Sequence, residues 1–247
     1  LYFEFHRGTY TSMARNKRGN RKSEYAMMEL ELLSVLAENA GKAYPTEELN
    51  RMWEMILTNQ FHDILPGSSI HEVYEQTKKE YAEIAETSAK LIGERMEALC
   101  GTKDESVTVW NTLGHRRNDV VVLGETAAEA MTDGTTVYPV QQTKDGAIVY
   151  AENLPSKGYQ VLRPTSGAAA ETPFAVTEAG EGYTLETPFY TIQIDANGEF
   201  TSLFDKENDR EVLQSGTTGN ELRIYEDKPL QYSAWNLDIF HTEKSWK

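Results

Sequence analysis

Three stretches in the first hundred residues repeat apolar side chains at the three-to-four-residue spacing of amphipathic helices. The first stretch begins near Asn20 and ends at Gly41, where the following Tyr44-Pro45 cannot continue a helix. The residues expected on its buried face are Tyr25, Met28, Leu32, Leu33 and Leu36.

The second stretch begins near Thr46 and ends near Gln60, and the third continues to Cys100 with Gly101 as its stop. Ser69-x-x-Glu72 at the start of the third stretch is a capping-box pattern. The core stripe expected in the second helix is Leu49, Met52, Trp53, Ile56 and Leu57. Because the connections are short, the sequence predicts a three-helix bundle.

After residue 105 the pattern changes to short β-type runs separated by Gly, Asn, Asp and Pro. Asn197-Gly198 predicts a two-residue hairpin loop. The expected strands lie at 106–111, 119–123, 136–141, 147–150, 158–163, 174–177, 183–185, 189–195, 199–204 and 221–225. The predicted fold class is therefore α+β and multidomain, with a three-helix bundle followed by antiparallel β-sandwich domains.

Changes in pattern divide the chain into four parts. Residues 1–13 indicate a strand end and a loop, and residues 14–102 the three-helix domain. Antiparallel β regions are expected at 103–165 and 166–247, and the family resemblance given below implies that they are a small β-sandwich domain and the beginning of a larger, truncated one. The polar, alanine-rich segment 165–172 marks the boundary between the two β regions.

The composition is typical of a globular domain, with 39% hydrophobic, 26% charged and 10% aromatic residues. No apolar run approaches the roughly 20 residues that cross a bilayer, so no membrane partner is expected. The N-terminus lacks a signal-peptide pattern. A single cysteine, Cys100, excludes an internal disulfide and is compatible with a reducing compartment, which favours a cytoplasmic location.

The net charge of −15 argues against a nucleic-acid partner, which selects basic surfaces. The charge is unevenly distributed, because residues 1–22 carry a net +5. Such a basic run usually lies on a solvated face or packs against an acidic neighbour. Binding of phosphate or of an acidic substrate is the alternative.

Two groups of residues offer chemistry. His62 and Asp63 are adjacent in a short Pro-Gly loop between two predicted helices, where an imidazole and a carboxylate can bind a metal or a polar ligand. The other interpretation of this loop is a capped turn whose polar groups satisfy the backbone. Glu4, His6 and Arg7 cluster at the predicted strand end. Metalloprotease, paired-cysteine, P-loop and nucleophile-elbow motifs are absent.

Several motifs, in order, resemble glycoside hydrolase family 38, in its bacterial and cytosolic or vacuolar α-mannosidase branch. The segments that carry the resemblance are FEFHRGTYTS with ARNKRGNRKSE, NQFHDILPGSSIHEVY, VTVWNTLGHRRNDVV, LPSKGYQVLRP, GEFTSLFDKENDREVL and EDKPLQYSAWNLDIF. They extend over nearly the whole chain. The first of them is similar to the segment by which the family's catalytic barrel enters its helical middle domain, so residues 1–13 are expected to be a remnant of that barrel.

The resemblance implies retaining hydrolysis of α-mannosides in mannose-containing oligosaccharides, with a carboxylate nucleophile and a zinc ion. His62 matches one zinc ligand and Asp63 a carboxylate that contacts substrate hydroxyls. Glu4, His6 and Arg7 match the barrel rim near the substrate, with Glu4 as a candidate general acid. The remaining zinc ligands and the nucleophile would belong to a barrel preceding Leu1, in the same polypeptide.

One histidine cannot complete a four-coordinate zinc site. The expectation is therefore that this chain alone holds no preformed zinc site and has no mannosidase activity. Trp235 and Asp238, in the PLQYSAWNLD motif, either support the site from the β side or have a structural role, and the structural role is the expectation. Two alternatives remain open, a non-catalytic carbohydrate-binding module and a structural interaction module. The linkage specificity and a homo-oligomeric state are also left open.

Overall fold

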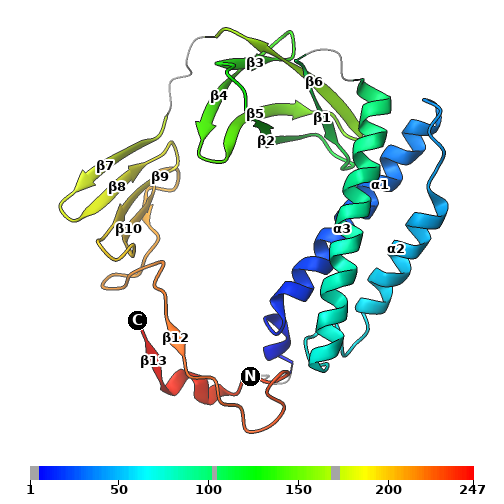
Figure 1. Cartoon of the computed structure of the whole chain (residues 1–247). Helices are drawn as coiled ribbons and strands as arrows, with labels where there is room; N and C mark the ends of the chain where they lie inside the picture. Colours follow the sequence, from blue (N-terminus) through cyan, green and yellow to red (C-terminus); the bar gives the residue numbers. More distant parts are fainter. Residues whose placement is uncertain (1–5, 102–104, 168–172) are drawn as a thin grey trace. The chain divides into compact units, whose positions relative to one another are not determined.

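The computed structural model describes residues 6–101, 105–167 and 173–247. A short 3-10 helix, η1 (Gly8–Tyr10), precedes three helices, α1 (Ala14–Glu38), α2 (Thr46–Asn59) and α3 (His71–Cys100), which lie side by side (Figure 1). The predicted order of three helices followed by antiparallel sheets is confirmed. No helix in these ranges is long and apolar enough to cross a membrane.

The predicted buried face of α1 is wrong in part. Tyr25 and Met28 are 56% and 58% exposed, and the helix begins at Ala14 rather than near Asn20. Apart from Leu33, the buried positions alternate steps of four and three residues, and half of the whole set is polar: Asn16, Asn20, Ser23, Met27, Leu30, Leu33, Ser34 and Ala37. An apolar pattern alone misplaces this face because asparagine and serine continue the stripe.

The bundle has one apolar core, made by residues from all three helices. Its buried members are Met27, Leu30, Leu49, Met52, Ile56, Tyr81 and Ile84. The predicted capping box at Ser69 is wrong, because α3 begins after Ile70, which makes no side-chain cap hydrogen bond within the described ranges. The backbone N–H of Ser69 instead donates to the Tyr74 hydroxyl at 2.9 Å.

The first β region forms a six-stranded antiparallel sheet in the order β1-β6-β3-β4-β5-β2. Its strands are β1 (Val107–Asn111), β2 (Arg117–Gly124), β3 (Ala130–Thr132), β4 (Val137–Thr143), β5 (Gly146–Leu154) and β6 (Gly158–Thr165). The sheet curls over its own core, because β1 also contacts β2 and β5. Met131, Tyr138, Val149, Ala151, Leu154 and Leu162 fill that core. The sequence prediction missed β3.

The second β region is a five-stranded meander in the order β11-β10-β9-β8-β7. Its strands are β7 (Ala175–Ala179), β8 (Gly182–Glu186), β9 (Tyr190–Ile194), β10 (Phe200–Asp205) and β11 (Arg210–Glu211). Strands β12 (Ile224–Tyr225) and β13 (Ser245–Trp246) pair separately, and η2 (Ile239–Glu243) lies between them in sequence.

The hairpin between β9 and β10 forms where it was predicted, but its two-residue loop is wrong. A type I′ turn requires positive φ at both Asn197 and Gly198. Of the two, Gly198 alone has a positive φ, +80°, and its N–H donates to the Asp195 carbonyl at 3.0 Å. These features are those of a type I turn followed by a left-handed glycine.

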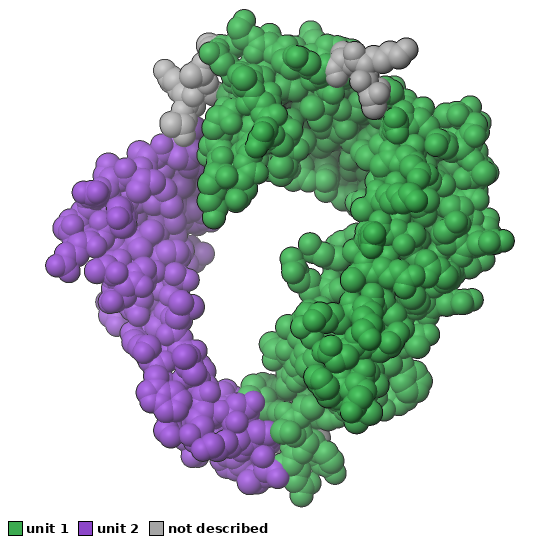
Figure 2. Space-filling model, viewed as in Figure 1, with its two compact units in different colours: residues 1–169, 231–237 green, residues 170–230, 238–247 purple. Residues whose placement is uncertain are grey.

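The chain divides into two compact units (Figure 2). One unit comprises Leu1–Ala169 with Gln231–Leu237, and the other comprises Ala170–Leu230 with Asp238–Lys247. The segment 231–237 thus packs with the helical part although it lies far along the sequence.

Candidate functional site

The loop between α2 and α3 exposes the two residues to which the sequence points. The side chains of His62 and Asp63 are 75% and 52% exposed, with His62 Nε2 3.6 Å from Asp63 Oδ2. The His62 ring lies against Phe61 with centroids 4.2 Å apart. Both side chains are therefore accessible to an external ligand, and the imidazole and the carboxylate are close enough to act on the same one.

The start of the loop is anchored to α1. The Gln60 side-chain amide donates to Asn20 Oδ1 at 2.9 Å and to Glu24 Oε1 at 2.8 Å. The Asn59 amide donates to Glu80 Oε2, on α3, at 2.8 Å. Asn20 and Asn59 are buried. These bonds fix the end of α2 against both neighbouring helices just before Phe61.

The end of the loop is anchored by Lys17. Its Nζ donates to the carbonyl oxygens of Ser12 at 2.5 Å, Leu65 at 2.9 Å and Pro66 at 3.0 Å. Burial lowers the pKa of the Lys17 ammonium. Asn16 Nδ2 donates to the Ile64 carbonyl at 3.2 Å.

A tyrosine and a glycine hold the same part of the loop. The hydroxyl of buried Tyr74 lies 3.4 Å from the Asp63 carbonyl oxygen and 3.2 Å from that of Ile64. Gly67 has a φ of +95°, and a Cβ there would lie 2.7 Å from the Ser12 carbonyl oxygen. A side chain at position 67 would therefore both strain the backbone and separate the loop from the segment before α1.

The segment before α1 brings His6 and Trp235 together. Their ring centroids are 4.9 Å apart, and the Gly8 N–H donates to the Trp235 carbonyl at 2.9 Å. Ser12 Oγ lies 2.8 Å from the Gly8 carbonyl oxygen and 3.0 Å from that of Ala234. These contacts give Trp235 a packing role beside His6 and Gly8.

The remaining residues that the sequence analysis singled out are Glu4, Arg7 and Asp238. Arg7 is partly buried, and Glu4 lies outside the described residues. Asp238 Oδ2 accepts a hydrogen bond from the Leu230 N–H at 2.8 Å, a local structural contact. Asp238 belongs to the second unit and His62 to the first.

A zinc ion needs more ligands than this loop provides. In ranges 6–101, 105–167 and 173–247, no group of three or more His, Cys, Asp or Glu side chains is arranged to hold a metal. Four-coordinate zinc sites use three or four protein ligands. Among the described residues, His62, with or without Asp63, could therefore supply part of a zinc site, but these residues do not form a complete one.

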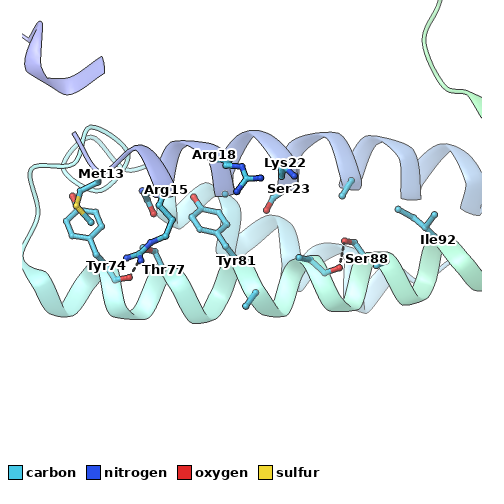
Figure 3. A pocket seen from close by; sticks show the side chains of 16 residues that line it. Met13, Arg15, Arg18, Lys22, Ser23, Tyr74, Thr77, Tyr81, Ser88 and Ile92 are labelled. Carbon is cyan, nitrogen blue, oxygen red and sulfur yellow. Dashed lines mark hydrogen bonds between the residues drawn. The ribbon is translucent and has the colours of Figure 1, made fainter. Parts of the chain in front are cut away.

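A separate groove lies between α1 and α3, with a volume of about 420 Å³. Figure 3 shows Arg15, Arg18 and Lys22 on its α1 side and Tyr81 reaching from α3 toward α1. Its wall is mainly apolar and includes small residues from both helices. Part of the basic run found in the sequence, Arg15, Arg18 and Lys22 on α1, thus borders this groove.

Two regions of the chain match the models of known protein families. Residues 4–99 match the alpha mannosidase middle domain, and residues 185–247 match the glycosyl hydrolases family 38 C-terminal domain. These matches define the chain as a glycoside hydrolase segment with a helical and a β part. It belongs to glycosyl hydrolase family 38.

Relatives agree with this assignment. Alpha-mannosidase 2C1 of Homo sapiens is 31% identical over 98% of this chain, and Alpha-mannosidase G of Dictyostelium discoideum is 30% identical over 99%. An alpha-mannosidase structure from Enterococcus faecalis V583 shares the fold over 83% of this chain, with a TM-score of 0.60 and 16% identity. The chain spans 22% and 26% of the two relatives' lengths, and 29% of the solved chain.

Sequence reasoning found His62 and Asp63 but missed the residues that hold their loop. Lys17, Asn16, Gln60 and Tyr74 come from three elements and meet only in the folded bundle. The one signal in the sequence was the polar residues that continue the apolar stripe of α1.

Proposed function

We propose that this chain is the helical and β portion of a retaining α-mannosidase, and that His62 and Asp63 form its contribution to the active site. The observation that carries the proposal is the exposed His-Asp pair on a loop anchored at both ends. An anchored loop holds a ligand-binding side chain in place before the ligand arrives, which lowers the entropy lost on binding.

In this proposal His62 supplies one nitrogen ligand to zinc, and Asp63 accepts hydrogen bonds from sugar hydroxyls. Zinc, when bound, would hold sugar hydroxyl groups. Retaining hydrolysis needs two carboxyl groups about 5–5.5 Å apart, so Asp63 in a substrate-binding role leaves both to other residues. Glu4 as general acid, with His6 and Arg7 near the substrate, belongs to the same proposal.

The experiment compares three forms of the family 38 enzyme that contains this chain: the unmodified enzyme, His62→Ala, and the control His71→Ala. His71 is also exposed, at the first position of α3. We expect His62→Ala to lose bound zinc and most hydrolysis of an aryl α-mannoside, and His71→Ala to keep both. Unchanged metal content and rate in His62→Ala would refute the proposal.

A second measurement uses the 247-residue chain by itself. Because the described residues bring no three metal ligands together, we expect it neither to hydrolyse the aryl α-mannoside nor to retain zinc after dialysis. Hydrolysis by this chain would show that the site is complete without further residues. Mannose-containing oligosaccharides as substrates and a cytoplasmic location remain predictions of the same proposal.

A further inference from the structure

One ammonium group joins the parts of the chain that surround the His-Asp loop. Lys17 lies near the start of α1, and its Nζ has three hydrogens and no acceptor capacity. The three carbonyl oxygens of Ser12, Leu65 and Pro66 lie within 3.0 Å of Nζ. Each hydrogen of the ammonium therefore has a backbone acceptor.

These three acceptors belong to two different segments. Leu65 and Pro66 follow the exposed residues 61–63 after one intervening residue, Ile64, whereas Ser12 closes the segment that carries His6. The Ser12 hydroxyl continues the connection, because Oγ lies 3.0 Å from the Ala234 carbonyl oxygen beside Trp235. Lys17 and Ser12 together thus tie three stretches of chain to the first turns of α1.

Other contacts reinforce this junction but do not replace the ammonium. Asn16 Nδ2 reaches the Ile64 carbonyl, one residue before those held by Lys17. Gly67 packs so closely on Ser12 that a Cβ would meet its backbone at 2.7–2.8 Å. Hydrogen bonds from a charged donor are about twice as strong as neutral ones. Lys17 is therefore the strongest single tie between the loop and α1.

We propose that Lys17 is a positioning residue that fixes the His62-Asp63 loop to α1 and to the segment carrying His6. The consequence for metal and sugar binding rests on the proposed function, whereas the positioning of the loop is measurable without it. Loss of the ammonium leaves two loop carbonyls without their donor and lets residues 61–67 move relative to α1.

The first test is hydrogen exchange followed by mass spectrometry on the 247-residue chain. The amides to follow are Ile64, Leu65 and Gly67, whose N–H groups donate within the loop. In Lys17→Met, which keeps the side-chain length and removes the charge, we expect their exchange to rise at least about tenfold.

Lys22→Met is the matched control, because Lys22 is an exposed lysine on the same helix with no hydrogen bond or ion pair to described residues. Lys17→Arg tests rescue, since a guanidinium also donates to several acceptors. We expect wild-type exchange in Lys22→Met and partial recovery in Lys17→Arg. Equal exchange in Lys17→Met and wild type, with α1 still folded by circular dichroism, would overturn the proposal.

The second test uses the enzyme that contains this chain and measures zinc affinity, kcat and KM. We expect Lys17→Met to weaken zinc binding and lower kcat by about tenfold or more, with the loss reduced in Lys17→Arg. A looser loop with unchanged zinc affinity and kcat would overturn a positioning role in the site. If His62→Ala leaves zinc binding unchanged while Lys17→Met still loosens the loop, the proposed function fails and the tie made by Lys17 stands.

Discussion

Two glycines in the middle of long helices should respond in opposite ways to the same substitution. A Cβ added at Gly19, in α1, would lie 2.6 Å and 2.8 Å from Cδ2 and Cγ of Tyr81. A Cβ added at Gly93, in α3, meets no described atom within 4 Å. Tyr81 is 9% exposed and belongs to the apolar core, so its ring cannot move out of the way without disturbing that core.

The expected changes in the free energy of unfolding follow from two opposing effects, the higher helix propensity of alanine and the overpacking of its methyl group. Replacing a helical glycine by alanine favours the folded state by about 0.5–1 kcal/mol. At Gly93 nothing opposes this gain. At Gly19 overpacking against Tyr81 costs about 1–3 kcal/mol, so the net free energy of unfolding should fall by up to roughly 2.5 kcal/mol. For a domain of the size of the helical bundle, Ala14 to Cys100, a change of about 1 kcal/mol in the free energy of unfolding shifts Tm by about 4–8 °C.

Thermal unfolding followed by circular dichroism at 222 nm reports on this domain, because the α-helices of the described ranges all lie between Ala14 and Cys100. We expect Gly93→Ala to raise Tm and Gly19→Ala to lower it. Gly19→Ala combined with Tyr81→Leu should destabilise less than the two single changes added together. If Gly19→Ala raised Tm as Gly93→Ala does, the close approach of α1 and α3 at Tyr81 would be refuted.

Two further predictions concern pH. Burial is the main cause that raises the pKa of Tyr81 to about 12, so the unfolded chain ionises first and the folded bundle loses stability as pH rises from about 10 toward 12. Tyr81→Phe should remove this decline in alkaline melts, and at neutral pH it should be at least as stable, because the buried hydroxyl has no partner among described residues. Hydrogen bonds from the Ser202 hydroxyl and from backbone N–H groups lower the pKa of Glu211 to about 2. The ionised Glu211 carboxylate therefore stabilises the five-stranded sheet at pH values above its ordinary pKa of 4.5, and this stabilisation is lost as pH falls toward 2. The Leu203 N–H donates to this carboxylate, so Glu211→Gln should make amide exchange at Leu203 less dependent on acid pH.

The sequence predicted the helices well where their stripe is apolar. The sequence predicts the second helix from Thr46 to Gln60, and the structure has Thr46–Asn59, because Leu49, Met52 and Ile56 supply a regular buried face; Leu57, predicted in the same stripe, is exposed. In α1 the same reasoning placed part of the buried face wrongly: Leu33 is buried as predicted, but Tyr25 and Met28 are exposed, and Asn16 and Asn20 are buried instead. Burial of a polar residue depends on partners in other elements, and a single-helix pattern contains no information about them.

The β regions show a different limit of sequence reasoning. Strand β3, Ala130–Thr132, is too short to produce a clear alternation, and it forms only because β4 and β6 pair with it on both sides. The turn at Gly198 was placed correctly, but its loop length depends on the hydrogen bonds of Asp195, whose side chain accepts from the N–H groups of Asn197 and Glu199. Non-local pairing and turn bonds of this kind decide register, and composition cannot.

In the candidate site, the residues that hold the loop in place differ from the two residues whose side chains the loop exposes. Most hydrogen bonds that fix the loop end on backbone carbonyls at 63–66 or on the side chains of Asn59 and Gln60. The side chains of His62 and Asp63 are exposed; among the described residues they make no hydrogen bond or ion pair with a third residue, and the His62 ring lies against Phe61. Lys17 and Tyr74 hold these carbonyls, so the loop is fixed without the side chains of His62 and Asp63, which is what the binding role proposed for those two residues requires.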